Sequence, residues 1–296
     1  MFENKEYLKF IQTSKKNNYD IVGISVIQTQ GSTYAKAGNL MLINSKYEFI
    51  GVFGSKHLHD QIFEYAKAAF ETKKSFYFEN IPKDKSSGHG SSKYFLQSFF
   101  LEDDYGLLGK ALNSFNKTLI RDIKDDTYEL SDEKIGLKYE NDKFYQVIKL
   151  PYSLLVFGSG SHVTSLISMA NLMGYKTTVI DTNMNNNYVN EADELIELEN
   201  FENILHMDLS QYNASVILSH NPKTDDTYLK ALLNSNVEYI GLMGNKTSMN
   251  RKTEEFNLQD EKRFFAPVGF DIGGNTHQSI ALSVCAQIEA RKNGKI

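Results

Sequence analysis

SLLVFGSGSHVTSLISMANLMG (153–174) is the stretch that decides the fold of this chain. It joins a short apolar strand to an amphipathic helix through a turn with two glycines. Gly158 permits the tight turn, and Gly160 leaves room for a phosphate to approach the backbone. The helix then offers free N–H groups and the positive end of its dipole. The stretch therefore predicts a cofactor-binding turn made of Gly158, Ser159, Gly160, Ser161 and His162.

The next strand-like segment ends in a carboxylate at the spacing used by dinucleotide-binding folds. Asp181 lies 21 residues after Gly160, where an acid accepts hydrogen bonds from a ribose hydroxyl. An acid here favours an NAD-like over an NADP-like ligand. Val163 stands where the pattern has a third glycine. Two plainer interpretations stay open: a turn that binds nothing, and Asp181 in a local cap or salt bridge.

Strands and helices alternate through the second half. The predicted strands are 153–157, 176–180, 194–198, 214–219, 238–243 and 263–268, and the predicted helices are 163–173, 225–235, 247–256 and 276–292. This alternation predicts an α/β fold: a Rossmann-like, doubly wound parallel sheet over residues 151–296.

The first half mixes helices with antiparallel strand patterns. Helices are predicted over 3–16, 58–74 and 106–116, and strands over 21–29, 39–44, 46–54, 75–80, 93–102 and 143–150. We expect a smaller N-terminal α+β domain (1–116) and a connecting segment with short strands (117–150). The Gly- and Ser-rich stretch 83–93 is predicted to be a mobile or binding loop.

Composition excludes several classes of protein. The 296 residues carry a net charge of -5 and no basic stripe, which argues against nucleic acid as a partner. The N-terminus lacks an apolar signal core, and no apolar run is long enough to span a membrane. The single cysteine, Cys285, excludes an internal disulfide and is interpreted as a core residue. A cytoplasmic protein is the expectation.

Several segments resemble the XdhC/CoxI family of accessory factors for molybdenum hydroxylases such as xanthine dehydrogenase. VGISVIQTQGSTYAKAGNLMLIN (22–44) is similar to the family's N-terminal motif, and the 153–174 stretch is similar to its Rossmann turn. Further similar segments are VILSHNPKTDDTYL (216–229), EYIGLMGNKTSMNRK (238–252) and APVGFDIGGNTHQSIALSVCAQIEA (266–290).

The resemblance implies a chaperone. Members of this family are understood to bind the molybdenum cofactor, to assist its sulfuration and to help insert it into an apo-enzyme. It therefore implies molybdopterin or a related nucleotide as ligand and a molybdenum hydroxylase apo-enzyme as partner. Residues 83–92 and the aromatic residues of 93–105 are candidate docking surfaces. A homodimer through pairing of N-terminal strands is compatible with the sequence, which does not fix the number of subunits.

Histidines replace residues that are common in the family. His57 and His89 stand where the family has cysteines, and His59 stands where it has glutamate. A role that needs a thiol at these places is thus in doubt. Three alternatives stay open: a metal site formed by His57, His59 and His89, a metal-free site for an anionic ligand, and no site.

Polar residues follow the fourth and fifth strands of the second half, at the edge where open α/β sheets bind ligands. His220 is a candidate acid–base residue, which Asp225 or Asp226 could orient. Gly244, Asn245 and Lys246 are further candidates, whereas Asp271 is either a turn-former or a site residue. If His220 acts on a nicotinamide, the chain is an NAD-dependent oxidoreductase. The remaining alternative is a nucleotide-sensing protein without catalysis.

Overall fold

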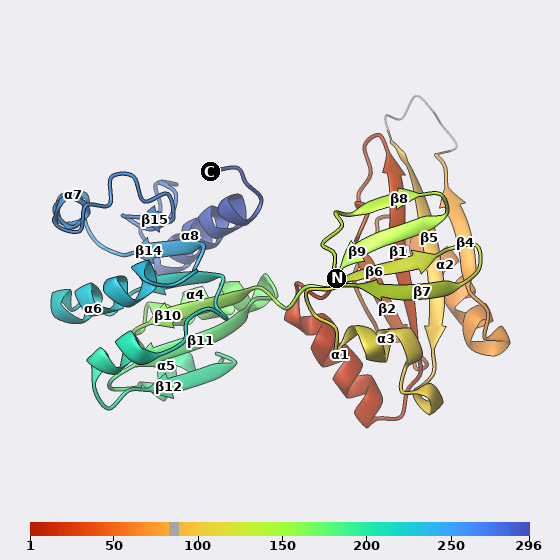
Figure 1. Cartoon of the computed structure of the whole chain (residues 1–296), viewed down its shortest axis with the longest axis horizontal. Helices are drawn as coiled ribbons and strands as arrows, with labels where there is room; N and C mark the ends of the chain where they lie inside the picture. The colour runs from red at the N-terminus through yellow and green to blue at the C-terminus, as the bar shows by residue number, and fades with distance from the viewer. Residues whose placement is uncertain (83–88) are drawn as a thin grey trace. The chain divides into compact units, whose positions relative to one another are not determined.

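The computed structural model describes residues 1–82 and 89–296, and for Lys246 it describes the backbone only. The chain divides into two compact units, Met1–Leu150 and Pro151–Ile296. Each unit is described by itself (Figure 1). The division falls at the residue that begins the predicted Rossmann-like domain.

The C-terminal unit is built on a six-stranded parallel sheet. Its strand order is β12-β11-β10-β13-β14-β15. The strands are β10 (Ser153–Phe157), β11 (Lys176–Asp181), β12 (Glu194–Glu197), β13 (Ala214–Ile217), β14 (Tyr239–Leu242) and β15 (Phe264–Phe265). The helices are α4 (Val163–Leu172), α5 (Asn186–Val189), the 3-10 helix η3 (Phe201–His206), α6 (Pro222–Leu233), α7 (Lys246–Glu255) and α8 (His277–Lys292).

Alternation along the central strand explains why this sheet is covered on both faces. Leu154 and Val156 of β10 pack with α4 and α8 in one apolar core. Leu155 and Phe157 point to the other face and pack with α6, α7 and η3. Successive side chains of a strand point to opposite faces, so a strand of five buried residues serves two cores. The predicted doubly wound Rossmann fold is confirmed.

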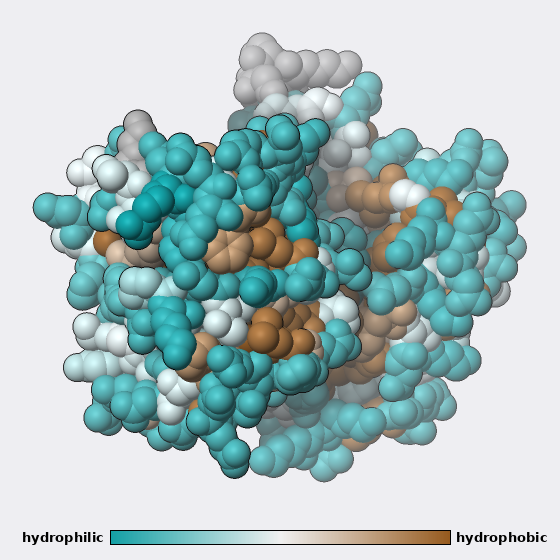
Figure 2. Space-filling model, turned by 60° about the vertical axis from the view of Figure 1, so that its left-hand side comes forward, coloured by the Kyte–Doolittle hydropathy of each residue, from teal (hydrophilic) through white to brown (hydrophobic). Residues whose placement is uncertain are grey.

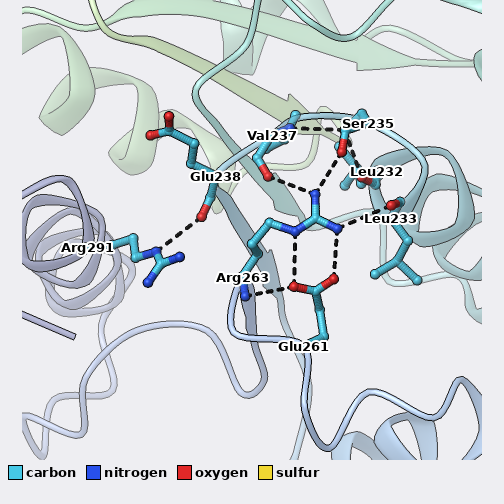
Figure 3. Close-up of polar contacts among 8 residues, drawn as sticks. All are labelled: Leu232, Leu233, Ser235, Val237, Glu238, Glu261, Arg263 and Arg291. Atoms are coloured by element: carbon cyan, nitrogen blue, oxygen red, sulfur yellow. Dashed lines mark hydrogen bonds and ion pairs between the residues drawn. The ribbon is translucent and has the colours of Figure 1, made fainter. Parts of the chain in front are cut away.

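Arg263 connects several backbone segments at the edge of the sheet where the strands begin. Arg263 donates two hydrogen bonds to the carboxylate of Glu261, at 3.0 and 2.7 Å. The same guanidinium donates to the backbone carbonyls of Leu233, Ser235 and Val237 (Figure 3). Unpaired carbonyls at the end of a helix need donors, and the planar guanidinium satisfies several at once.

The N-terminal unit contains a five-stranded antiparallel sheet of order β3-β2-β1-β5-β4. Its strands are β1 (Ile21–Gln30), β2 (Leu40–Asn44), β3 (Phe49–Ile50), β4 (Phe76–Asn80) and β5 (Ser91–Phe99). The helices of the unit are α1 (Lys5–Lys16), α2 (Lys56–Thr72), the 3-10 helix η2 (Leu101–Asp103) and α3 (Gly106–Ala111). Helix α2 packs on one face through Leu58, Ile62 and Ala66.

A second antiparallel sheet covers the other face of the first sheet (Figure 1). It has the order β7-β6-β9-β8, formed by β6 (Thr118–Asp122), β7 (Thr127–Ser131), β8 (Lys138–Glu140) and β9 (Lys143–Val147). Leu119 of β6 and Ile148, which follows β9, share a core with Ile21 and Phe99 of the first sheet. The prediction of a separate connecting segment over 117–150 is therefore wrong, and so is the prediction that the N-terminal domain is the smaller one.

Two local predictions also need correction. The strand expected over 46–54 is only the two residues of β3, because Gly51 is in the left-handed region (φ +94°) and Tyr47 is as well. The aromatic residues of 93–105 do not form a docking surface, since Tyr94, Phe95 and Tyr105 are buried. Part of the predicted 83–93 loop, residues 83–88, lies outside the described residues. Among the described residues, no helix has the length and apolar character needed to cross a membrane.

Candidate functional site

The glycine turn lies between β10 and α4, at the carboxyl edge of the parallel sheet. Gly158 is in the left-handed region, with φ +105°. A Cβ atom there would lie 2.9 Å from the carbonyl oxygen of Leu218, which follows the neighbouring strand β13. Glycine is thus required by both the backbone conformation and the close approach of the adjacent chain.

Ser159 ties this turn to the end of the next strand. Its buried hydroxyl donates a 2.6 Å hydrogen bond to Oδ2 of Asp181 and accepts one from the backbone N–H of Asn185 at 3.0 Å. The other carboxylate oxygen, Oδ1, accepts from the N–H of Thr182 at 2.7 Å. Each carboxylate oxygen has a second lone pair, so Asp181 retains acceptor capacity. Ser161 is exposed.

The imidazole of His162 lies over Gly160. A Cβ atom on Gly160 would lie 2.7 Å from Cε1 of His162, so this side chain takes up the space that the glycine leaves. Nε2 of His162 lies 3.1 Å from the carbonyl oxygen of Leu218, which makes Nε2 the protonated nitrogen. The sequence predicted that a phosphate could approach the backbone at Gly160. In this conformation the imidazole of His162 occupies that space.

Two further histidines meet His162 from other parts of the chain. The ring of His220, which follows β13, lies edge-on at a centroid distance of 4.5 Å. The ring of His277, the first residue of α8, lies at 6.4 Å. Both are exposed, whereas His162 is half-buried. Burial lowers the pKa of His162, and the neighbouring His220 and His277 lower it further, against the Leu218 hydrogen bond, which raises it.

Apolar side chains lie directly behind this histidine cluster. A narrow pocket is lined by His162 and His277 together with Leu166, Leu218, Met243, Ile280 and Val284. The same unit exposes Phe270, Ile272 and Leu282. Figure 2 shows apolar side chains gathered on the face of this unit that is turned to the viewer. The edge therefore combines polar groups with apolar surface, as small-molecule sites commonly do.

The aspartates proposed to orient His220 are engaged elsewhere. Asp225 accepts a hydrogen bond from the hydroxyl of Ser219, and Asp226 forms an ion pair with the buried Lys252 of α7. Burial raises the pKa of Asp225, although the Ser219 hydrogen bond and the charges of Lys252 and His220 oppose this shift. His220 itself is in the left-handed region (φ +55°).

The other candidates at this edge have mostly local roles. Asn245 caps α7, since its side chain accepts from the N–H of Ser248 at 2.9 Å. Gly244 precedes it, and the side chain of Lys246 lies outside the described residues. Asp271 accepts from the N–H of Gly273 at 3.1 Å and is exposed, as in a turn. Burial raises the pKa of the Cys285 thiol to about 12, which matches the core role predicted for it.

In the N-terminal unit, one loop contacts both histidine-bearing segments. Ser32 forms a β-bridge with His89, and its carbonyl accepts from the N–H of Gly90 at 2.6 Å. Tyr34 lies against Gly54, just before α2. The family-like segments around residues 31, 57 and 89 are thus neighbours, which their distance along the sequence does not show.

The three histidines of this region nevertheless do not form a ligand set. His59 uses Nε2 to accept a hydrogen bond from the N–H of Phe53 at 3.2 Å, and His57 is exposed in the first turn of α2. Residues i and i+2 of a helix diverge. Across residues 1–82 and 89–296, no group of three or more His, Cys, Asp or Glu residues is placed to hold a metal ion. The metal-site prediction for His57, His59 and His89 is therefore not supported by this geometry.

Comparison with known proteins connects both units to one family. The family model described as the XdhC Rossmann domain matches residues 154–288. The model described as the XdhC and CoxI family matches residues 16–79. The first covers the glycine turn, the histidine cluster and α8 up to residue 288, and the second covers β1 to β4.

Individual relatives agree with this result. The chain is 22% identical to a Bacillus subtilis (strain 168) protein named as a probable xanthine dehydrogenase subunit, over 89% of this chain and 91% of that protein. It is 28% identical to the uncharacterized protein YqeB of Escherichia coli (strain K12), over 47% of this chain and 27% of that protein. A crystal structure of a xanthine dehydrogenase from Bacillus halodurans shares the fold, with a TM-score of 0.81 at 19% identity, and the match covers 100% of this chain and 97% of that one. The predicted family is confirmed: this chain belongs to the XdhC and CoxI family.

Proposed function

We propose that this chain is an accessory protein for a molybdenum hydroxylase of the xanthine dehydrogenase type, and that its Rossmann unit binds the molybdenum cofactor or a related nucleotide. Family membership supports the accessory role. So does similarity along most of its length to a protein named as a probable xanthine dehydrogenase subunit.

The contact between Ser159 and Asp181 is the observation that carries the binding proposal. It places a carboxylate beside the glycine turn, at the edge where α/β sheets hold ligands. Both oxygens of Asp181 already accept one hydrogen bond, which fixes the orientation of the carboxylate. A fixed acceptor next to backbone N–H groups suits a ribose or a pterin amide on one side and a phosphate on the other.

The fit requires one rearrangement. Because His162 lies over Gly160, a phosphate reaches the backbone there only after the imidazole has turned away. The movement breaks one hydrogen bond, to Leu218, and exposes a half-buried ring. Once the ring has turned away, the space beside the backbone of Gly160 is free for a phosphate.

An NAD-dependent oxidoreductase is the alternative that we do not favour. General acid–base catalysis by His220 would need a group that orients its ring. Asp225 and Asp226 are engaged with Ser219 and Lys252 instead. The non-catalytic nucleotide sensor shares the binding site with our proposal and differs only in the partner.

The binding proposal is tested by calorimetric titration of the full-length chain with NAD, NADP and molybdenum cofactor released from a molybdenum hydroxylase. We expect cofactor binding in the wild type and at least tenfold weaker binding in Asp181→Ala. Asp271→Ala is the matched control, since it removes an exposed aspartate from a turn of the same unit. Equal cofactor affinity in both variants would show that Asp181 does not contribute to cofactor binding.

The accessory role is tested in cells. Deleting the gene should abolish activity of the client hydroxylase while leaving its apo-enzyme present at normal levels. Full hydroxylase activity after deletion contradicts the proposal. Dehydrogenase turnover of the purified chain with NAD would favour the oxidoreductase instead.

A further inference from the structure

A polar layer crosses the interior of the N-terminal unit, between its two sheets. Ile21 and Phe99, paired across β1 and β5, face the second sheet in one apolar cluster. Phe95 faces the second sheet in another cluster, together with Phe144 of β9. Between these clusters, Ser25 pairs with Phe95 and Gln97 pairs with Gly23, so both side chains point to the same interior.

The second sheet supplies the other half of the layer. Arg121 of β6 pairs with Phe144 of β9, and Leu119 pairs with Gln146. Leu119 and Phe144 belong to the two apolar clusters, which places Arg121 and Gln146 on the inner face between them. Four polar side chains thus interrupt an otherwise apolar interior, and all are at least nine-tenths buried: Ser25, Gln97, Arg121 and Gln146.

The hydrogen bonds of this layer are incomplete. Among the described residues, Arg121 Nε, Ser25 Oγ and Gln97 Oε1 are buried without a partner. Within the described residues, the Arg121 side chain has one hydrogen bond, a long 3.4 Å contact from Nη2 to Oε1 of Gln146, and its guanidinium lies 5.1 Å from the ring centre of Phe144. Buried polar groups without partners cost free energy, and most native structures avoid them.

The charge of Arg121 is also uncompensated. In the part of the chain that the structure describes, Arg121 forms no ion pair with a carboxylate. Burial lowers its pKa to about 10, so the guanidinium stays charged at neutral pH. Asp126, which contacts the layer through Gln97, accepts from Gln97 Nε2 and from Ser75 Oγ, each at 2.6 Å. A buried cation without a counter-ion costs free energy, so a bound anion would stabilise this layer.

Gln97 connects the layer with the surface. It lines an open pocket together with Ser75, Asp126 and Tyr128. Tyr128 is the neighbour of Arg121 across β6 and β7, on the same face. Gln97 and Tyr128 thus line this pocket and also border the polar layer.

We propose that the layer is a binding site for one small oxyanion that keeps a hydroxyl group, such as hydrogen carbonate or hydrogen phosphate. The N–H of Arg121 and the O–H of Ser25 are donors that suit the charged oxygens. Gln97 Oε1 is an acceptor, because the bond from Nε2 to Asp126 fixes which end of the amide points inward. That acceptor matches the hydroxyl of the ligand and does not match a halide.

The test is the thermal unfolding midpoint of the full-length chain in sodium hydrogen carbonate, phosphate, chloride or gluconate at equal ionic strength. A ligand at about ten times its Kd should raise the midpoint by about 3 to 6 °C. We expect this rise in hydrogen carbonate or phosphate and not in chloride or gluconate. Equal midpoints in all four salts, or an equal rise in chloride, would overturn the proposal.

Variants locate the effect. Arg121→Met keeps the length of the side chain without the charge and should lose the anion-dependent rise. Arg251→Met, at an exposed position, should retain it. If Arg121→Met does not fold, Ser25→Ala removes one donor and should raise the anion concentration for half of the effect severalfold. An unchanged anion response in Ser25→Ala, or in folded Arg121→Met, would place the anion elsewhere and contradict this site.

Discussion

The hydroxyl of Ser159 donates a 2.6 Å hydrogen bond to the carboxylate of Asp181, across the ends of two parallel strands. This contact makes the glycine turn and the end of β11 one structural unit. The same hydroxyl accepts the backbone N–H of Asn185, so a third segment is held by one side chain. The position of the proposed ligand acceptor thus depends on a residue between the two glycines.

Replacing Ser159 with alanine should destabilise the chain by about 1 to 2 kcal/mol, because two polar partners lose a hydrogen bond in a partly buried place. It should also weaken ligand binding, since Asp181 is no longer oriented. Chemical denaturation and calorimetric titration measure the two effects. Asn236→Ala, at an exposed position that precedes β14 in the same unit, is the control and should change neither. A loss of stability without any loss of binding would show that the orientation of Asp181 does not affect ligand binding.

The fold of the C-terminal unit could be predicted because each of its main elements has a local signal. Strand β10 occupies the predicted residues 153–157, and α4 begins at the predicted residue 163. The second sheet of the N-terminal unit could not be predicted in this way. Strand β7 is partly exposed, and the buried strand β6 includes Arg121 and Asp122 among its five residues, so neither strand has a strong apolar alternation. Their core depends instead on contacts with β1 and β5.

The candidate site was predictable in its parts but not in its arrangement. The glycine spacing and Asp181 are visible in the sequence, since they recur at fixed offsets. The direction of the His162 ring and its meeting with His220 and His277 are tertiary, because three separate segments supply them. Nothing in the sequence indicates that Ser159 would hold Asp181, or that Arg121 would be buried.

Arg263 should be important for stability although it lies away from the site. Arg263→Ala removes a guanidinium that donates to Glu261 and to three backbone carbonyls, and we expect a loss of about 2 kcal/mol. Arg263→Lys should restore little, because an ammonium cannot reproduce the planar fork. Denaturant unfolding measures both. Arg291→Ala, which removes a weaker contact to Glu238, is the matched control (Figure 3). Equal losses in the two alanine variants would contradict the role given to Arg263.

In the N-terminal unit, His59 and His57 should differ in effect. His59→Ala removes the acceptor for the N–H of Phe53 and an edge-on contact with Phe49, and should cost about 1 kcal/mol. His57→Ala should leave stability unchanged, because its side chain is exposed. Thermal unfolding of both variants tests this difference. If zinc or nickel raises the unfolding temperature of the wild type but of neither variant, the result would support a metal site at His57 and His59.

Removing the ring of His162 should strengthen ligand binding if the imidazole blocks the backbone of Gly160. His162→Ala opens that space, so binding no longer includes the cost of displacing the ring. We expect affinity for the phosphate-bearing ligand to rise about 3- to 10-fold, measured by calorimetry at about pH 7.5. His206→Ala, an exposed histidine of the same unit, should leave the affinity unchanged. Weaker binding in His162→Ala would mean that the ring contacts the ligand rather than excluding it.

The stability of the chain should fall in mild acid because of the same residue. Burial lowers the pKa of His162 in the folded chain below its ordinary value of 6.5, so the unfolded chain binds a proton more readily. Stability from this group is therefore fully present above about pH 6.5 and is lost as the pH falls through the lower, folded-state pKa. His162→Gln should flatten this part of the profile, measured as the free energy of unfolding between about pH 7.5 and 5. His206→Gln should keep the wild-type slope, and a wild-type slope in His162→Gln as well would assign the acid sensitivity to other groups.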